Sequence, residues 1–233
     1  MRKIKDTKEK LVFEAEVNIT LANGIRRYVN SVPVIAIEEV EISRNDSPLY
    51  DETVAHRMGL IPLKQGKKDA KFKLKVKREG MVYSGDIEGE AQIVYDKIPI
   101  TLLSKGQEIE IKGTTAPGIG KDHAKFSPGN LTYREVVEVT LEKNCAEKVK
   151  QVVPEVNIKV KGNSAVIIDE LEKEIVDVCE GICEKEGKNL EVKPLNKVIF
   201  NMESFGQLKT QDIFKKALDI FKKELEEVNK KLK

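Results

Sequence analysis

The sequence has almost no excess of charge of either sign, and it contains few cysteines. Its 233 residues hold 41 lysines and arginines against 39 aspartates and glutamates, which gives a formal net charge of +2. Non-specific binding to nucleic acid depends on an excess of basic side chains that neutralise phosphates. We therefore expect little or no direct contact with DNA. The 3 cysteines are an odd number for a disulfide framework.

No long apolar run indicates a membrane span or a secretory signal. The first residues, Met1–Asp6, are mostly charged and lead into no apolar segment. A signal peptide or a transmembrane helix requires such a segment. We therefore expect a cytoplasmic protein that does not contact a membrane.

The chain also lacks the residue combinations of common catalytic sites. His56 and His123 are its only histidines, and neither has a nearby nucleophile with a third, orienting group. The segment Gly118–Lys121 is similar to part of a phosphate-binding loop, but Thr115 replaces the first glycine and Asp122 follows the lysine. An aspartate-rich triplet that could hold two magnesium ions is also missing. The sequence thus predicts no catalytic residues and no active site of its own.

The patterns that are present predict an α+β fold. Apolar and polar residues alternate near residues 11–19, and a short apolar run starts a second strand near residues 34–43. Between these strands, Thr20 is a candidate helix cap and Pro33 ends the helix. The expected apolar face of this first helix consists of Leu21, Ile25, Tyr28 and Val29, and the other face offers Asn23, Arg26, Arg27 and Asn30.

The middle of the chain is expected to be a mostly β insert. Alternation dominates from about Lys71 to Thr140, and one predicted strand holds Phe72, Leu74 and Val76. Glycines and prolines separate the predicted strands. Short helices are expected between about residues 143 and 187.

A long helix is predicted at the end of the sequence, beginning near Thr210. Its apolar residues repeat with the heptad spacing of helices that pack against a partner helix. Packing on the protein's own sheet is the alternative, but the length and the terminal position favour contact of at least part of the helix with another subunit. We call these residues the heptad stripe: Phe214, Leu218, Phe221, Leu225, Val228 and Leu232.

Several segments together resemble the D subunit of archaeal DNA-directed RNA polymerase, the counterpart of the bacterial alpha subunit. The resemblance covers most of the chain, and the segment from Gly118 to Pro128 is the most specific. The family usually has a tryptophan where this chain has Phe126. In chain order the segments are Leu21–Arg27, Ser31–Pro33, Leu49–Glu52, His56–Leu63, Ser84–Asp86, Asp96–Ile100, Gly106–Ile109, Gly118–Pro128 and Glu203–Leu208.

The resemblance implies a non-catalytic assembly and scaffold subunit of the polymerase, a nucleotidyltransferase complex that transcribes DNA into RNA. It implies a dimerisation domain split into residues 1–42 and 196–233, with an insert domain at 43–195. The heptad stripe would then face subunit L, and the pair would recruit subunits N, P and B, of which B is the large catalytic one. The residues implied at the large-subunit interface are Arg26, Arg27, His56 and Arg57.

Many members of this family carry a ferredoxin-like domain, and residues 141–190 resemble a remnant of one. A cluster of the [4Fe–4S] type takes four thiolates. The resemblance assigns Cys145 and Cys183 to one cluster site and Cys179 to the other, so we expect vestigial thiols, no bound metal and no cofactor. The remnant would then rest on apolar residues, namely Val149, Val152, Val166, Ile168 and Leu171. The alternative function is a ferredoxin-like electron-transfer or redox protein.

Overall fold

The computed structural model describes residues 1–232, and these form two compact units. The first unit holds Met1–Arg26 with Leu131–Met202, and the second holds Arg27–Asn130 with the segment that begins at Glu203. Within the described range, five α-helices accompany mostly antiparallel sheets, which confirms the predicted α+β fold. No helix among the described residues is long and apolar enough to span a membrane. The predicted domain boundaries at 42/43 and 195/196 stay a prediction.

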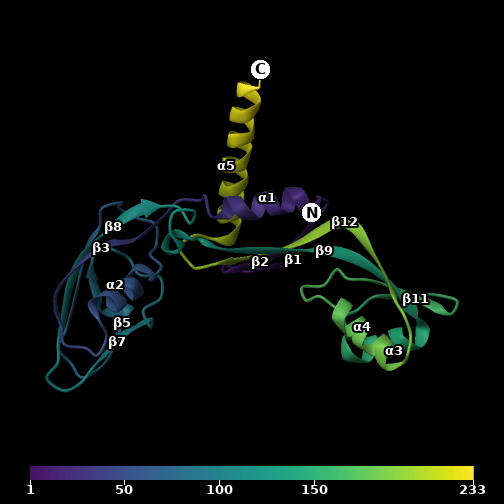
Figure 1. The fold of residues 1–233 in the computed structure, drawn as a ribbon, viewed down its shortest axis with the longest axis horizontal. Helices are drawn as coiled ribbons and strands as arrows, with labels where there is room; N and C mark the ends of the chain where they lie inside the picture. The colour runs from purple at the N-terminus through teal and green to yellow at the C-terminus, as the bar shows by residue number, and fades with distance from the viewer. Residues whose placement is uncertain (233) are drawn as a thin grey trace. The chain divides into compact units, whose positions relative to one another are not determined.

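A six-stranded sheet forms the framework of the first unit (Figure 1). Its strand order is β1-β2-β12-β9-β11-β10. In order along the chain the strands are β1 (Arg2–Asp6), β2 (Lys10–Ala15), β9 (Gly129–Glu142), β10 (Ile158–Lys161), β11 (Ser164–Ile168) and β12 (Glu191–Ser204).

Strand β2 differs from its predicted alternation because both of its faces are covered. Four successive residues, 11 to 14, are buried, and the strand ends at Ala15 rather than near residue 19. Val12 belongs to a small apolar cluster, whereas the ring of Phe13 stacks on that of Phe200 with centroids 5.2 Å apart. Burial acts to raise the pKa of Glu14, but Lys197 and Arg2 outweigh it and hold that pKa below its ordinary value.

The predicted ferredoxin-like segment forms two helices packed against a hairpin of the same sheet. The helices are α3 (Lys143–Val152) and α4 (Val176–Lys185), and the hairpin is β10–β11. The prediction of its apolar core was partly wrong. Val149 is buried, but Val152 is 63% exposed, and β11 buries Ala165 and Ile167 rather than their neighbours Val166 and Ile168. A shift of one residue along a strand exchanges its two faces, and alternation does not show which face is inside.

A buried ion pair fixes the loop between β11 and α4 to the sheet. Arg134 on β9 donates to both carboxylate oxygens of Asp169, each at 3.0 Å, and to the carbonyl of Leu171 at 2.6 Å. The Asp169 carboxylate also accepts the N–H of Ile175 at 3.2 Å. Asp169 is fully buried, and burial raises its pKa against the opposing effect of Arg134.

The second unit packs one helix and a two-stranded ribbon against a four-stranded sheet of order β3-β8-β4-β6. Strand β4 alternates between exposed and buried residues as predicted. Gly113 on β8 is required by close packing, since a Cβ there would lie 2.5 Å from the ring of Phe72. The elements are β3 (Val34–Asn45), α2 (Asp51–Gly59), β4 (Lys71–Val76), β5 (Gly80–Tyr83), β6 (Ile87–Gly89), β7 (Pro99–Leu103) and β8 (Ile109–Gly118), with short 3-10 turns at Ser84–Asp86 and Ala124–Phe126.

The Arg134–Asp169 pair yields a stability prediction. Arg134→Met should lower the free energy of unfolding by about 3 to 5 kcal/mol, because it leaves a buried carboxylate without its partner. The folded-state pKa of Asp169 then rises further above its unfolded value. The penalty should therefore be smallest in acid and should grow as the pH rises from the unfolded pKa to the folded one. Urea unfolding of the variant and of the parent chain, compared in acid and at neutral pH, measures the change.

The double variant Arg134→Met with Asp169→Leu is the matched control, because it removes both charges together. It should recover most of the loss. A single variant as stable as the parent chain at both pH values would show that the ion pair does not hold the loop.

Candidate subunit interface

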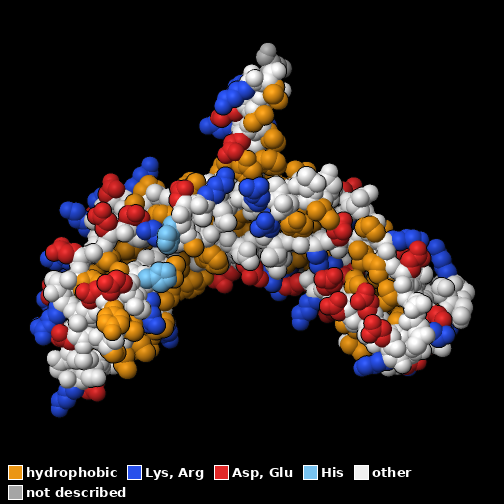
Figure 2. Space-filling view, in the orientation of Figure 1, with side chains coloured by type: hydrophobic (Ala, Val, Ile, Leu, Met, Phe, Trp, Pro, Cys, Tyr) orange, Lys and Arg blue, Asp and Glu red, His pale blue; other side chains and the backbone are white. Residues whose placement is uncertain are grey.

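The terminal helix α5 (Thr210–Lys231) begins at the predicted residue, but its two halves lie in different surroundings. Thr210, Ile213 and Ala217 are buried in its first half. The heptad stripe is half-buried from Phe214 to Phe221 and then exposed. Leu225 and Val228 are each 53% exposed and Leu232 is 81% exposed. Figure 2 shows hydrophobic side chains along one side of this helix. The second half therefore presents an apolar stripe that no described residue covers.

A contact with helix α1 (Ile19–Val29) marks the point where α5 stops packing on its own chain. The ring centroids of Phe221 and Tyr28 lie 4.6 Å apart, and the Tyr28 hydroxyl donates a hydrogen bond to the Glu224 carboxylate at 2.5 Å. This hydrogen bond is the main cause that raises the pKa of Tyr28. Lys121 adds a cation over the Tyr28 ring, 5.0 Å from its centroid. Beyond Glu224 the described part of the helix has no such anchor.

The segment Gly118–Pro128 is tied to the residue that follows α1. The backbone carbonyl of Asn30 accepts a hydrogen bond from the N–H of Lys121 at 3.0 Å. The side-chain oxygen of Asn30 accepts a second one from the Ser127 hydroxyl at 2.8 Å. A Cβ on Gly120 would lie 2.9 Å from the Ser127 hydroxyl oxygen and 3.0 Å from the Asn30 side-chain oxygen, so a larger residue would push against the side chains that form this contact. The hydrogen bonds of Asn30 therefore connect the end of α1 to the segment Gly118–Pro128, two parts of the chain that carry the family resemblance.

Two details of the α1 prediction were wrong. The cap is Asn18, whose side-chain oxygen accepts the N–H of Leu21 at 2.8 Å, and not Thr20. Leu21 is 41% exposed, while Ala22 takes its place on the buried face with Ile25 and Val29. Asn18 and Thr20 are both good caps, and only the observed start of the helix distinguishes them.

The predicted arginines of α1 are exposed. Arg26 donates to the side-chain oxygen of Asn23 at 3.0 Å, which pre-orders its guanidinium on the helix surface. Arg27 is also exposed. Both side chains remain accessible to a partner.

Helix α2 presents His56 and Arg57 on the surface and buries Val54 and Met58. Arg57 also donates to the carbonyl of Ile100 at 2.9 Å. Its guanidinium is thus partly used within the chain, which the sequence did not indicate.

The residues that follow α2 line a pocket of about 380 Å³ in the second unit. Leu60 and Pro62 form one wall, Lys125 and Ser127 another, and Phe205 and Gln207 a third. These residues come from three of the segments that carry the family resemblance. Leu60 and Phe205 are about half exposed, so the pocket has an apolar rim.

The three cysteines are all buried, with Cys145 on α3 and Cys179 and Cys183 on α4. The structure brings Cys145 and Cys183 into contact and leaves both in the apolar core of their segment. Burial raises the pKa of Cys179 to about 11 and that of Cys183 to about 12. Among the described residues, no group of three or more His, Cys, Asp or Glu side chains is arranged to hold a metal ion.

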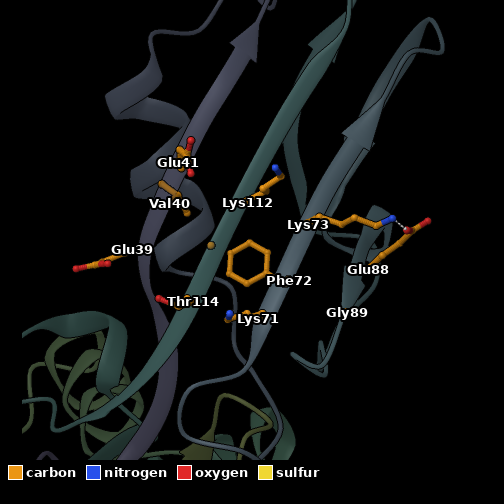
Figure 3. Close-up of a pocket in the computed structure, with 11 residues that line it drawn as sticks. Glu39, Val40, Glu41, Lys71, Phe72, Lys73, Glu88, Gly89, Lys112 and Thr114 are labelled. Atoms are coloured by element: carbon orange, nitrogen blue, oxygen red, sulfur yellow. Dashed lines mark ion pairs between the residues drawn. The ribbon is translucent and has the colours of Figure 1, made fainter.

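A groove of about 550 Å³ on the four-stranded sheet has no catalytic arrangement among its lining residues (Figure 3). Its lining consists mainly of lysines and glutamates on adjacent strands around Phe72, with one ion pair of 3.0 Å between Lys73 and Glu88. The lining residues include neither a histidine nor a cysteine, and their one hydroxyl, Thr114, has no histidine base beside it.

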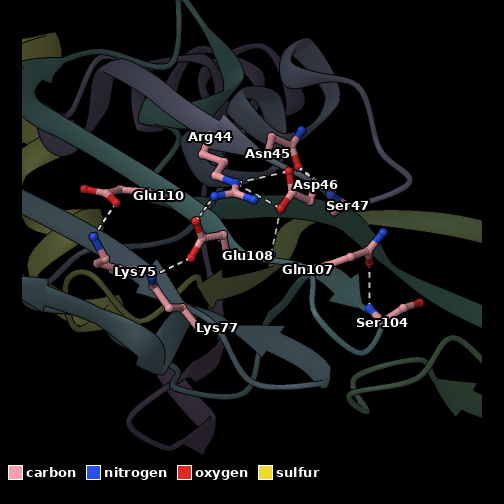
Figure 4. Close-up of polar contacts among 10 residues, drawn as sticks. All are labelled: Arg44, Asn45, Asp46, Ser47, Lys75, Lys77, Ser104, Gln107, Glu108 and Glu110. Atoms are coloured by element: carbon pink, nitrogen blue, oxygen red, sulfur yellow. Dashed lines mark hydrogen bonds and ion pairs between the residues drawn. The ribbon is translucent and has the colours of Figure 1, made fainter.

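A network of charges crosses one end of the same sheet (Figure 4). Glu108 pairs with Arg44 and with Lys77, the latter at 2.7 Å, and Lys75 pairs with Glu110. Arg44 also pairs with Asp46 at 3.0 Å. These groups are exposed or at the surface, and such networks contribute modestly to stability. Because each of these charged groups is paired within the chain, the network is typical of ion pairs that stabilise a fold rather than of a binding site.

Comparison with known proteins gives the same family throughout. Residues 40–132 match the family described as the RNA polymerase Rpb3/RpoA insert domain. The DNA-directed RNA polymerase subunit Rpo3 of Pyrococcus horikoshii is 34% identical over 236 residues, which cover 92% of this chain and 90% of that relative. The Rpo3 subunit of Methanocaldococcus jannaschii is 40% identical over 141 residues, covering 58% of this chain and 73% of the relative. That of Pyrococcus furiosus is 32% identical, with 87% and 84% covered.

Proposed function

The chain belongs to the Rpo3 family of DNA-directed RNA polymerase subunits, and on that basis we propose that it is a non-catalytic assembly subunit that pairs with subunit L. The observation that carries the pairing is the uncovered second half of the heptad stripe. Its residues Leu225, Val228 and Leu232 are exposed on a helix whose first half is anchored. An apolar stripe of this spacing is stabilised by a facing helix.

The proposed pairing domain is split in sequence into residues 1–42 and 196–233, with the insert domain at 43–195. The match of residues 40–132 to an insert domain supports the position of the first boundary. The pair would then recruit subunits N, P and B. This function places the chain in the cytoplasm with the DNA that the polymerase transcribes, with little or no DNA contact of its own.

The surface proposed for the large catalytic subunit consists of Arg26, Arg27, His56 and Arg57. The exposure of these side chains supports the proposal. The three arginines would donate charge-assisted hydrogen bonds to carboxylates or carbonyls of the neighbour. The comparisons give no support to the alternative of a ferredoxin-like electron-transfer protein.

The first prediction from this function concerns the heptad stripe. The double variant Leu225→Ala with Val228→Ala should weaken pairing with subunit L by at least about a hundredfold, because it truncates two side chains that would be buried at the interface. The variant leaves the Phe221 ring on Tyr28 unchanged, so the anchor of the helix is kept. A binding titration with purified subunit L measures the loss.

The matched control is Lys223→Ala with Lys230→Ala, on the polar positions of the same half of the helix. It should pair normally. Equal affinity of the stripe variant and the control variant would show that this part of the helix does not pair with subunit L.

The second prediction separates assembly from pairing. Arg26→Ala with Arg27→Ala should leave the pair with subunit L intact and weaken capture of the large catalytic subunit, because it removes charge-assisted contacts with that neighbour and keeps the buried face of α1. A two-step pull-down compares both events, with Arg44→Ala and Arg78→Ala as a control at arginines that form ion pairs within the chain. Loss of the pair with subunit L itself would mean that the two arginines serve pairing or folding.

The third prediction is that the chain binds no iron–sulfur cluster when it is reconstituted anaerobically with iron and sulfide. It has 3 cysteines, fewer than the four thiolates of a [4Fe–4S] cluster. All three are buried, and burial raises the pKa of Cys179 and of Cys183, which favours the neutral thiols at these two positions. Iron analysis and the visible absorbance band of a thiolate-bound cluster provide the readout. Stoichiometric iron with that absorbance band would restore a redox role.

A further inference from the structure

The six-stranded sheet has two outer strands that differ in character. At one edge, β1 carries Arg2, Lys3, Lys5 and Asp6, and its pairing shifts between Lys3 and Lys5. Arg2 pairs with Glu14, Lys3 with Asp6, and Lys5 with Glu172. Charged residues and bulges are devices that keep an edge from pairing with another strand. The β1 edge is therefore protected.

The other edge, β10, continues the apolar rows of the sheet to the surface. Val139, Ile167 and Ile158 stand opposite one another on three adjacent strands. Leu141, Ala165 and Val160 form the next row. The inner members of both rows are buried, but Val160 at the edge is 53% exposed. An added strand would extend both rows and cover this side chain.

A groove of about 410 Å³ runs along the same edge between β10 and α3. Ile158 and Val160 line it from the strand, and Lys143, Glu147 and Lys150 line it from the helix. Lys150 is held over the groove by a hydrogen bond to the carbonyl of Val156. The groove thus has an apolar floor and a helical wall with more positive than negative charge.

The opposite face of β10 is basic. Lys159 and Lys161 are exposed there, and within the described residues neither forms an ion pair. They stand opposite Val166 and Ser164 of β11, so no acid of the neighbouring strand compensates them. In an added strand, the residues directly opposite these lysines would be most favourable as aspartate or glutamate, because opposite charges in cross-strand pairs attract.

We propose that the β10 edge is a docking site for an extended segment of another protein in which apolar and acidic residues alternate. The segment would add a seventh strand to the six-stranded sheet by main-chain hydrogen bonding. Its apolar side chains would cover Val160 and Ile158 on the α3 side, and its acidic side chains would lie opposite Lys159 and Lys161. This site lies on the predicted ferredoxin-like segment and does not depend on pairing with subunit L.

Three fluorescent peptides of eight residues test the proposal with the full chain in low salt, measured by anisotropy. One alternates valine with glutamate, one valine with lysine, and one serine with glutamate. The valine–glutamate peptide should bind at least about tenfold more tightly than either of the others, since two favourable pairs and two apolar contacts are at stake. High salt should weaken it because the charges are exposed.

The variant Lys159→Glu with Lys161→Glu should reverse the preference toward the valine–lysine peptide. The control Lys8→Glu with Lys173→Glu, at exposed positions elsewhere in the same unit, should behave as the parent chain. Equal binding of the serine and valine peptides, an unchanged preference in the first variant, or the same loss in the control would overturn the proposal. So would self-association of the parent chain that the first variant abolishes, because a second copy would then be the occupant.

Discussion

The helix α5 packs on its own chain at one end and is uncovered at the other, and the proposed function depends on this asymmetry. Near the start of α5, Ile213 and Ala217 are buried. In its middle, the Phe221 ring packs on the ring of Tyr28, and Glu224 accepts a hydrogen bond from the Tyr28 hydroxyl. Past that point the heptad stripe continues without cover from the described residues. A helix fixed at its base presents its free half with little loss of conformational freedom on binding, and such pre-organisation favours association. Under the proposed function, folding of the chain and pairing with subunit L would therefore depend on the same helix.

Within the described residues, an apolar cluster and a buried ion pair hold the predicted ferredoxin-like segment together. Its three thiols lie inside an apolar cluster with Val149, Ala165 and Ile167, where buried cysteines act as small apolar side chains. The Arg134–Asp169 pair then ties the segment to the sheet. These two features account for a stable fold with fewer thiolates than a cluster needs. Strand β10 is packed on this apolar cluster through Ile158, and it lies at the edge of the six-stranded sheet.

The sequence predicted most reliably where one local pattern decides the structure. The heptad spacing from Phe214 located α5, and alternation at Phe72, Leu74 and Val76 located β4. Prediction failed where residues distant in sequence determine which face of a strand is buried. Alternation at β2 could not show that Phe200 covers the second face, and nothing local indicated that β11 turns Ile167 inward.

The residues of the proposed interfaces divide in the same way. Exposure of Arg26 and Arg27 follows from helix periodicity, whereas the bond from Arg57 to the carbonyl of Ile100 joins residues far apart in sequence. The link between Tyr28 and Glu224 is also long-range. Neither alternation nor heptad spacing can predict such hydrogen bonds, because both patterns describe only residues that are close in sequence. The three-walled pocket of Leu60, Lys125 and Phe205 is likewise built from segments that only the fold unites.

Whether the uncovered half of α5 is a pairing surface can be decided by the mass of the protein in solution, measured by size exclusion with light scattering, alone and after co-expression with subunit L. We expect a one-to-one heterodimer with subunit L. The chain alone should self-associate or be poorly soluble, because an uncovered apolar stripe in water promotes aggregation. A monodisperse monomer that stays separate from subunit L would show that the stripe is not a pairing surface.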